Sequence, residues 1–481
     1  MYRRVIPGQH MLEIPFGVEL RTDNRWVQFA RIMPWEKIDV LYLANFSESE
    51  MKGQVAKPSR LAFGALFIQS RLNLTDDETV EQIRENPSIQ YFCGFETYTT
   101  EKPFDSSLMV HFRKRLTAEM MKKITEEAFA AEAKKAVEKE DDGDAGGTAG
   151  GGEAGGSSDS AETVEVTNKG IMLLDATCCP ADIQYPTDVR LLNHGRELTE
   201  RIIDELHEQL KQPGFMKPRT YREVARQDYL RFARKRKYTQ QQLRNAIRQQ
   251  LQYVRRNLES IKGQIGQGAF VFEISPDLQD KYPTIQKLYE QQKQMYDDRT
   301  HKVEGRIVSI SQPWLRPIVR GKANAPVEFG AKVATARIGG FSFVMHMDYE
   351  NFAEAQYLEE SAEEYRRIFG FYPKAIIGDK VYGCRANRNY CKTKGIRLSG
   401  PGLGRKAEET KESELEQIYS DSRKRNAIEG DYGTGKRRYG MDRIMAKLDN
   451  TTFTAISFGN FVKNAERLRK IRAIEPASQG I

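Results

Sequence analysis

The chain has 481 residues, of which 30% are charged and 39% are apolar, as in a water-soluble globular protein of about three ordinary domains. The formal net charge of +8 favours polyanionic partners without identifying one. No stretch approaches the roughly 18 apolar residues of a membrane-spanning helix, and five scattered cysteines exclude a disulfide framework. We therefore expect a cytoplasmic protein with no membrane partner.

The first 138 residues read as a set of short helices. The stretch "RLAFGALFIQSRLNL" has apolar residues at three- and four-residue spacing. In "LTDDETVEQIREN", Thr75 has the place of an N-cap and Glu78 completes a capping box. Basic residues on the outer faces suit a DNA-binding or dimerising bundle, although a helical packing domain fits equally well. We predict an N-terminal helical DNA-binding or dimerisation domain over 1–138.

A composition break follows at "KEDDGDAGGTAGGGEAGGSSDSAET". Glycine, alanine, serine and acidic residues dominate this stretch, which therefore cannot bury enough apolar surface to fold. We predict a flexible linker over 139–163.

After the linker, strand and helix signals alternate. They are a buried run "GIMLLDAT", two strands joined at Gly339-Gly340, an amphipathic helix closed by Gly370, a second buried run "KAIIGDK" and a last amphipathic helix. This order predicts an α/β domain with a mixed sheet. We assign it to 164–193 and 326–470, with a tail over 471–481.

A long, basic and helical segment interrupts this α/β pattern over 194–325. It contains "YREVARQDYLRFARKRKYTQQQLRNAIRQQLQYVRRNLESIKGQ", in which tyrosine and leucine alternate with arginine and lysine. Such a helix suits a phosphate backbone, although a solvated helical hairpin shows the same pattern. We predict a basic helical insertion that binds DNA, with contacts from Arg234, Lys235, Arg236 and Lys237.

The stretch 430–436, "GDYGTGK", fits G-x-x-x-x-G-K, most of a nucleotide-binding phosphate loop. A working loop follows a buried strand and has Ser or Thr after the lysine to hold Mg²⁺. Here a polar helical pattern precedes the loop, and Arg437 follows the lysine. We therefore expect no nucleotide cofactor.

Three carboxylates offer a better explanation. Asp175 ends one buried run, Asp379 ends another, and Glu429 lies on the polar helix. Two carboxylates at the ends of neighbouring strands repel each other unless a divalent cation lies between them. With the third carboxylate they form a site for two Mg²⁺ ions, the arrangement used in phosphodiester chemistry. We predict all three residues as metal ligands and catalytic residues.

The surroundings of Glu429 agree with a site that grips a polyanion. Arg425, Glu429, Tyr432 and Lys436 are four, three and four residues apart, which places them on one helix face. An ordinary exposed ion pair has the same spacing. The glycines that follow Glu429 cost about 1 kcal/mol each within a helix, so they indicate either close approach of a DNA backbone or the end of the helix.

With these motifs, the chain resembles bacterial insertion-sequence transposases that carry a DDE triad, in the branch with the signature Y-x2-R-x3-E-x6-K. Arg425, Glu429 and Lys436 match that spacing, whereas Ser422 stands at the tyrosine position. "LLDATCCPADIQYPTDVRLLN" and "IIGDKVYG" are similar to the regions of the family's first and second aspartates. The resemblance covers most of the chain outside the linker.

The resemblance implies an RNase H-like catalytic core with a helical insertion. It implies binding to terminal inverted repeats, metal-dependent cleavage at the transposon ends and strand transfer into target DNA. The cofactor would be two Mg²⁺ ions, with Mn²⁺ as a substitute, and the synaptic complex at least a homodimer on the bacterial nucleoid. Arg425, Lys436 and Lys380 would contact DNA phosphates. A nuclease without strand transfer, and an inactive DNA-binding remnant of a transposon, are the competing readings.

Overall fold

The structure, a computed structural model, describes residues 20–46, 56–144, 168–210, 216–319, 327–400 and 408–474. It divides into two compact units. Unit 1 comprises Met1–Ala181, Ala331–Asp348 and Phe352–Ile481, and unit 2 comprises Asp182–Gly330 and Tyr349–Asn351. Within the described ranges, no helix is long and apolar enough to cross a membrane. The predicted domain boundaries stay predictions, because a packing unit need not be a functional domain.

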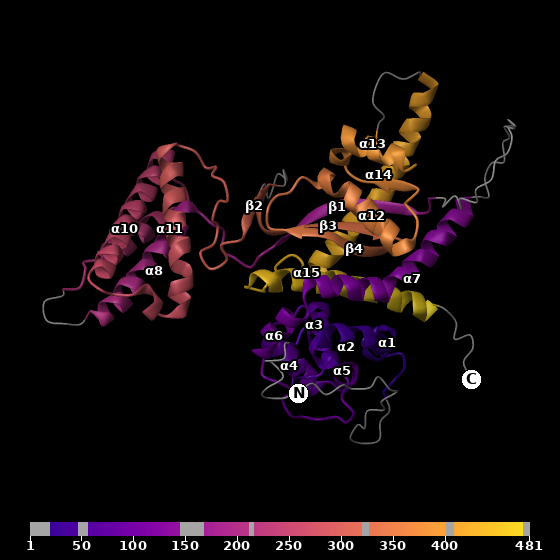
Figure 1. Ribbon diagram of the computed structural model, residues 1–481, viewed down its shortest axis with the longest axis horizontal. Helices are drawn as coiled ribbons and strands as arrows, with labels where there is room; N and C mark the ends of the chain where they lie inside the picture. Colours follow the sequence, from indigo (N-terminus) through magenta and orange to yellow (C-terminus); the bar gives the residue numbers. More distant parts are fainter. Residues whose placement is uncertain are drawn as a thin grey trace. The chain divides into compact units, whose positions relative to one another are not determined.

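Unit 1 is built around a mixed β-sheet, so the predicted mixed α/β class is confirmed (Figure 1). Strands β1, β5 and β6 are parallel, whereas β3 and β4 form an antiparallel hairpin beside β1. The bounds are β1 (Ile171–Pro180), β3 (Val327–Ile338), β4 (Phe341–Asp348), β5 (Ala375–Ile377) and β6 (Arg397–Leu398).

The β3–β4 turn confirms the predicted hairpin at Gly339-Gly340. Both glycines have positive φ, +54° and +86°, as a two-residue type I′ turn requires. A Cβ on Gly339 would lie 2.4 Å from the carbonyl oxygen of Ala133, and one on Gly340 would lie 2.1 Å from Nη2 of Arg467. A side chain at Gly339 would therefore collide with the backbone of Ala133, and one at Gly340 would displace the guanidinium of Arg467.

The chain before the linker forms short helices, as predicted. They are α1 (Arg25–Ile32), α2 (Trp35–Leu43), α3 (Ser59–Leu72), α4 (Asp76–Glu85), α5 (Pro87–Cys93), α6 (Leu108–Arg115) and the longer α7 (Ala118–Asp144). The predicted N-cap of α4 is confirmed, because Thr75 Oγ1 accepts a hydrogen bond of 3.2 Å from the backbone N–H of Glu78. α7 continues to Asp144, six residues into the predicted linker. Residues 145–163 lie outside the described residues.

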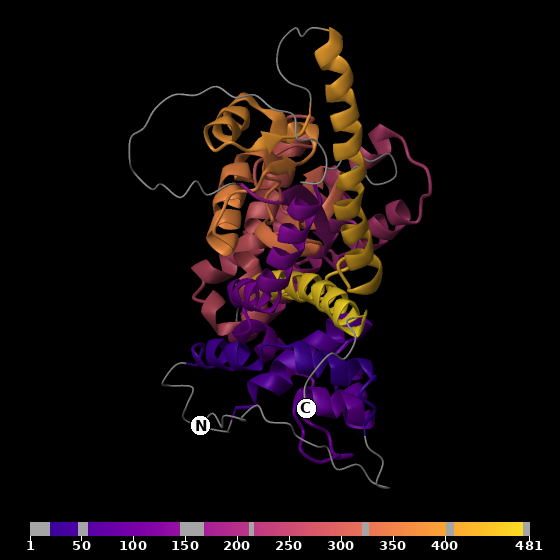
Figure 2. The same ribbon diagram turned by 90° about the vertical axis from the view of Figure 1, so that its right-hand side faces the viewer.

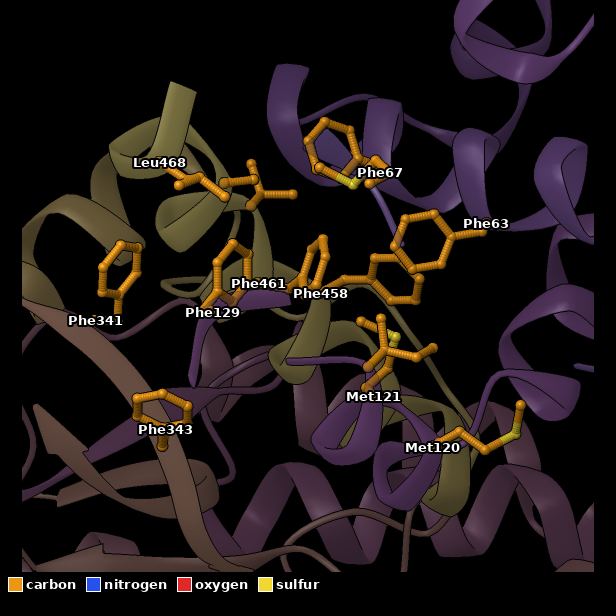
Figure 3. Packing of buried hydrophobic residues seen from close by; sticks show 14 of the residues in the cluster. Phe63, Phe67, Met120, Met121, Phe129, Phe341, Phe343, Phe458, Phe461 and Leu468 are labelled. Carbon is orange, nitrogen blue, oxygen red and sulfur yellow. The ribbon is translucent and has the colours of Figure 1, made fainter. Parts of the chain in front are cut away.

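Aromatic side chains join these helices and the sheet into one hydrophobic core (Figure 3). Phe461 lies between the two groups: its ring centroid is 5.4 Å from that of Phe63 on α3 and 5.0 Å from that of Phe129 on α7. Phe129 in turn stacks on Phe341 of β4 at 5.6 Å. Such aromatic pairs add to the stabilisation from burial. The N-terminal helices are therefore part of the same packing unit as the sheet.

Four further helices complete unit 1: α12 (Leu358–Phe369), α13 (Arg385–Thr393), α14 (Glu408–Arg438) and α15 (Asp449–Ile474). Gly370 ends α12 with φ +88°, as predicted. The tail was predicted to begin at residue 471, but α15 continues to Ile474, and residues 475–481 lie outside the described residues. α14 is the long gold helix in Figure 2; it packs on β1 and β5 and contacts α15.

Unit 2 is a helical bundle with a hydrophobic core of its own. Its elements are α8 (Asp188–Gln209), α9 (Arg222–Ala233), α10 (Gln240–Gly266), η2 (Val271–Glu273), α11 (Pro276–Asp297) and β2 (Arg316–Val319). β2 pairs antiparallel with residues 327–330, where β3 begins. Arg196 is buried in the bundle and donates to Glu200 Oε1 at 2.6 Å and to Asn193 Oδ1 at 2.8 Å, so its charge is neutralised.

Candidate active site

Asp175 lies on β1, and Asp379 lies two residues beyond the end of the neighbouring strand β5. β1 and β5 are parallel, with Leu173 opposite Ile377. Asp175 and Asp379 each follow these residues by two positions. Asp379 is the residue before the 3-10 helix Lys380–Gly383, where the strand has ended. Because side chains two residues apart share a face of a strand, Asp175 lies on the face of Leu173. α14 covers that face and packs on the two apolar side chains through Ile428.

One part of the prediction for Asp175 was wrong. The residue was expected to end its strand, but β1 continues to Pro180. Asp175 interrupts the apolar sequence because its side chain is only partly buried. The strand itself continues beyond it and includes the buried residues Cys178 and Cys179.

Glu429 reaches the site from α14, which does not end at the glycines. The helix continues through Gly430, Gly433 and Gly435 to Arg438, so the alternative of a helix end at Glu429 is excluded. Arg425, one turn before Glu429, donates to Glu429 Oε1 at 2.9 Å and to Asp379 Oδ1 at 3.0 Å. One guanidinium therefore joins two of the three predicted carboxylates.

Asp175 lies close enough to Asp379, Glu354 and Arg425 for their charges to shift its pKa. The pKa of Asp175 is raised to about 6, mainly by burial. A hydrogen bond of 2.8 Å from the backbone N–H of Ala176 opposes that rise. Negative charge on Glu354 and Asp379 raises the pKa further, and the Arg425 cation lowers it. The anionic form of Asp175 is thus disfavoured by its surroundings.

Tyr432 fixes α14 against the sheet at this point. Its hydroxyl donates to the backbone oxygen of Asp175 at 2.6 Å and lies 2.6 Å from Oγ1 of Thr335 on β3. Since the phenol has a single hydrogen, Thr335 is the donor in the second bond. Tyr432 therefore ties α14 to both β1 and β3, a role that its place on the helix face alone did not reveal.

Two residues near the carboxylates were missed from the sequence. Glu354 on η3 (Glu354–Tyr357) forms an ion pair of 3.0 Å with Lys332. Tyr382 on η4 (Lys380–Gly383) is 1% exposed, and its hydroxyl has no hydrogen-bond partner among the described residues. Burial and the negative charges of Glu354, Asp175 and Asp379 raise the pKa of Tyr382. The only sequence signal for Tyr382 was its position three residues after Asp379. No sequence signal pointed to Glu354.

The predicted lysine contacts lie on the same elements. Lys380 is exposed at the start of η4, and its backbone N–H donates to Asp379 Oδ1 at 2.7 Å. Lys436 is half-buried near the end of α14, seven residues after Glu429. Neither amine takes part in an ion pair within the described part of the chain.

The basic residues Arg234, Lys235, Arg236 and Lys237 belong to unit 2, unlike the carboxylates. They are exposed and directly follow α9. Next to them, Tyr238 packs on Phe232 with ring centroids 4.9 Å apart. Asp188, near Asp175 in sequence, accepts from Arg306 at 2.7 Å and from Gln292 at 3.0 Å inside this unit.

Across the described ranges, no group of three or more His, Cys, Asp or Glu side chains is arranged to hold a metal ion. At the carboxylates, Arg425 supplies the positive charge between Asp379 and Glu429. The donor types are nevertheless those that hard divalent cations prefer, because every candidate ligand is a carboxylate.

Two family models match the chain. A transposase DDE domain matches residues 376–464, which include Asp379 and Glu429, and a transposase domain (DUF772) matches residues 17–115. The chain is also 29% identical over 165 residues to "Uncharacterized protein ORF8 in nfe locus" of Rhizobium meliloti, a match that covers 34% of this chain and 66% of that protein. No solved structure matches the chain.

The fold and the site define a mixed α/β protein with carboxylates gathered under one helix. Both family models are of transposase domains, so the resemblance to transposases drawn from the sequence is confirmed.

Proposed function

We propose that this protein cuts DNA at the terminal inverted repeats of an insertion sequence and transfers the strands into target DNA. One observation carries the proposal: Asp175 on β1 and Asp379, just beyond the end of the parallel strand β5, each follow paired residues by two positions, and Arg425 joins Asp379 to Glu429. Three acids brought together from separate segments, inside a chain with a transposase DDE domain, fit phosphodiester chemistry.

A divalent cation fits the chemistry of these residues. Burial and neighbouring carboxylates disfavour the charged form of Asp175, whose pKa is raised to about 6, and a cation would relieve that cost. Asp175, Asp379 and Glu429 would hold Mg²⁺, as two ions, with Mn²⁺ as a substitute. When bound, the metal supplies Lewis-acid stabilisation of the attacking and leaving oxygens.

The remaining roles fall to the chain's own residues. Arg425 and Lys436 hold DNA phosphates beside the cut, with Lys380 next to Asp379. Arg425 then exchanges part of its pairing with Glu429 and Asp379 for a phosphate, which a guanidinium binds through two parallel hydrogen bonds. Water is the first nucleophile at the scissile phosphate, and a 3′-hydroxyl attacks the target phosphate later.

The proposal includes an RNase H-like core, a homodimer in the synaptic complex and additional DNA contacts from Arg234, Lys235, Arg236 and Lys237 of unit 2. The mixed sheet with its parallel β1 and β5 supports the core assignment, and the exposure of the unit 2 cations supports the additional DNA contacts. A protein with these properties works on the bacterial nucleoid.

The test is Mg²⁺-dependent cleavage of a duplex that carries the gene's own flanking ends. Wild type is compared with Asp379→Ala and with Asp442→Ala, a matched change at an exposed aspartate just after α14. We expect end cleavage by wild type and Asp442→Ala, and none by Asp379→Ala in a folded state shown by circular dichroism.

A supercoiled target plasmid then separates the competing readings. Joined products establish strand transfer, whereas cleavage without joining indicates a nuclease. Equal cleavage by wild type and Asp379→Ala contradicts the carboxylate assignment. Binding without cleavage by all three proteins supports an inactive remnant.

A further inference from the structure

A basic groove in unit 1 lies beside the β3–β4 turn and is unused by the site above. Two cavities share Gly340: one of about 710 Å³ between α14 and α15, and one of about 550 Å³ beside the first residues of β1 and β5. We call them together the hairpin groove. The larger cavity is lined by five cations and two carboxylates; the cations are Arg437, Arg438, Lys463, Arg467 and Lys470.

The two carboxylates of the larger cavity are already neutralised. Asp431 lies 3.0 Å from Nε of Arg337, and Glu466 lies 3.1 Å from Nη2 of Arg469. By contrast, no ion pair within the described ranges includes Arg437, Arg438, Arg467 or Lys470, and all four are exposed. The groove therefore has an excess of positive charge that the fold does not balance.

Lys463 is the most deeply buried cation of the larger cavity. It donates to Oγ of Ser342 at 2.8 Å and lies 3.8 Å from Asp431. Burial lowers its pKa to about 8; Asp431 opposes the shift and the Arg337 cation adds to it. An anionic ligand in the groove would favour the charged amine.

The groove and the carboxylate site lie on opposite flanks of α14. Glu429 and Arg438 are nine residues apart, which at 3.6 residues per turn is roughly 180° around the helix. Lys424, which lines the smaller cavity, adjoins Arg425 in sequence but points about 100° away from it. The flanks are separated by roughly one helix diameter, 10–12 Å, close to the ~12 Å width of a major groove.

We propose that the hairpin groove binds the phosphate backbone of the duplex whose end is cut at the carboxylates. The proposal rests on the proposed function for the identity of the DNA. Its own basis is the unbalanced charge of the groove and its separation from Glu429. Contacts of lysine and arginine with phosphates carry no base information, so the groove fixes the position of the duplex and not its sequence.

The test measures binding of a labelled end duplex, and of a scrambled duplex, in EDTA between 50 and 200 mM salt. Lys470→Gln and the double variant Arg438→Gln/Lys470→Gln remove groove charge. Arg472→Gln is the matched control, because it removes one exposed charge from α15 roughly 200° around the helix from Lys470. Each lost phosphate contact should lower the slope of log affinity against log salt by about 1, equally on both duplexes.

The proposal is overturned if the groove variants keep the slope of Arg472→Gln, if the loss is confined to the end duplex, or if wild type binds no duplex. Asp379→Ala separates this proposal from the proposed function. It should keep the wild-type salt slope while cleavage is lost. If the wild-type protein binds DNA through the hairpin groove but never cleaves it, the proposed function is wrong and the proposed role of the groove is kept.

Discussion

Tyr432→Phe tests whether α14 is fixed to the sheet through one hydroxyl. The phenol is buried, donates to the backbone oxygen of Asp175 and accepts from Thr335, both at 2.6 Å. Phenylalanine keeps the ring, which packs with Leu173 and Ile428, and removes only the oxygen. The change therefore isolates the two hydrogen bonds from the packing.

The expected cost follows from the partners that remain. Thr335 is 1% exposed, so its hydroxyl loses an acceptor where water cannot readily replace it. A buried polar group left without a partner costs about 1–3 kcal/mol, and we expect the free energy of unfolding to fall by that amount. Because Tyr432 sets α14 against Asp175, cleavage should fall on the order of 10–100-fold, the effect of a small misplacement of catalytic groups.

Urea denaturation followed by circular dichroism measures the first effect, and end cleavage measures the second. Tyr419→Phe is the control, since Tyr419 lies on the same helix but is 66% exposed. It should leave both quantities at the wild-type value. The reasoning is refuted if Tyr432→Phe is no less stable than Tyr419→Phe.

Three further predictions concern stability. Gly430→Ala should raise the free energy of unfolding by up to about 1 kcal/mol, because the new Cβ would meet nothing within 4 Å. Gly459→Ala should lower it, because the new Cβ would lie 3.0 Å from a backbone oxygen. Urea titrations of both variants measure these changes. Hydrogen bonds from Arg367, with Lys122, lower the pKa of Glu364 to about 2, so this carboxylate stabilises the fold above its unfolded pKa near 4.5. The stability lost in Glu364→Gln should be largest above that pH and shrink as pH falls towards 2, and a constant difference in melts from pH 2 to 7 would contradict it. Tyr382→Phe should not lower stability, because it removes a buried hydroxyl that has no hydrogen-bond partner among the described residues. A loss of 1 kcal/mol or more in the same titration would reveal a missed hydrogen bond.

Much of the fold could be predicted from local patterns. The hairpin at Gly339-Gly340, the helix ended by Gly370 and the N-cap at Thr75 each depend on a few neighbouring residues, and each was found. Errors occurred where no breaker residue marks an end. α7 runs six residues into the predicted linker and α15 runs four residues into the predicted tail, and neither extension contains a proline, the residue that most strongly ends a helix.

The site was predictable only in part, for a related reason. A buried run followed by a carboxylate is a local signal, and it found Asp175 and Asp379. Glu354 and Tyr382 come near them through the packing of η3 on η4, which no periodicity encodes. The assignment of Asp175, Asp379 and Glu429 as metal ligands stays a prediction, which the cleavage assay tests.

The three sides of α14 explain why its sequence is unusual. One side packs on the sheet through Ile428 and Tyr432, and the next presents Arg425 and Glu429 to Asp379. The third lines the hairpin groove. The glycines then have separate causes. A Cβ on Gly435 would lie 2.6 Å from the sulfur of Met441, which would have to move. A Cβ on Gly430 would meet nothing within 4 Å. No contact within the described residues therefore requires glycine at position 430, next to Glu429. A DNA backbone that passes close to the helix at this turn would require it. Gly430→Ala therefore separates the two demands: a variant that is more stable yet cleaves more slowly would place the DNA against that turn, and one that cleaves at the wild-type rate would not.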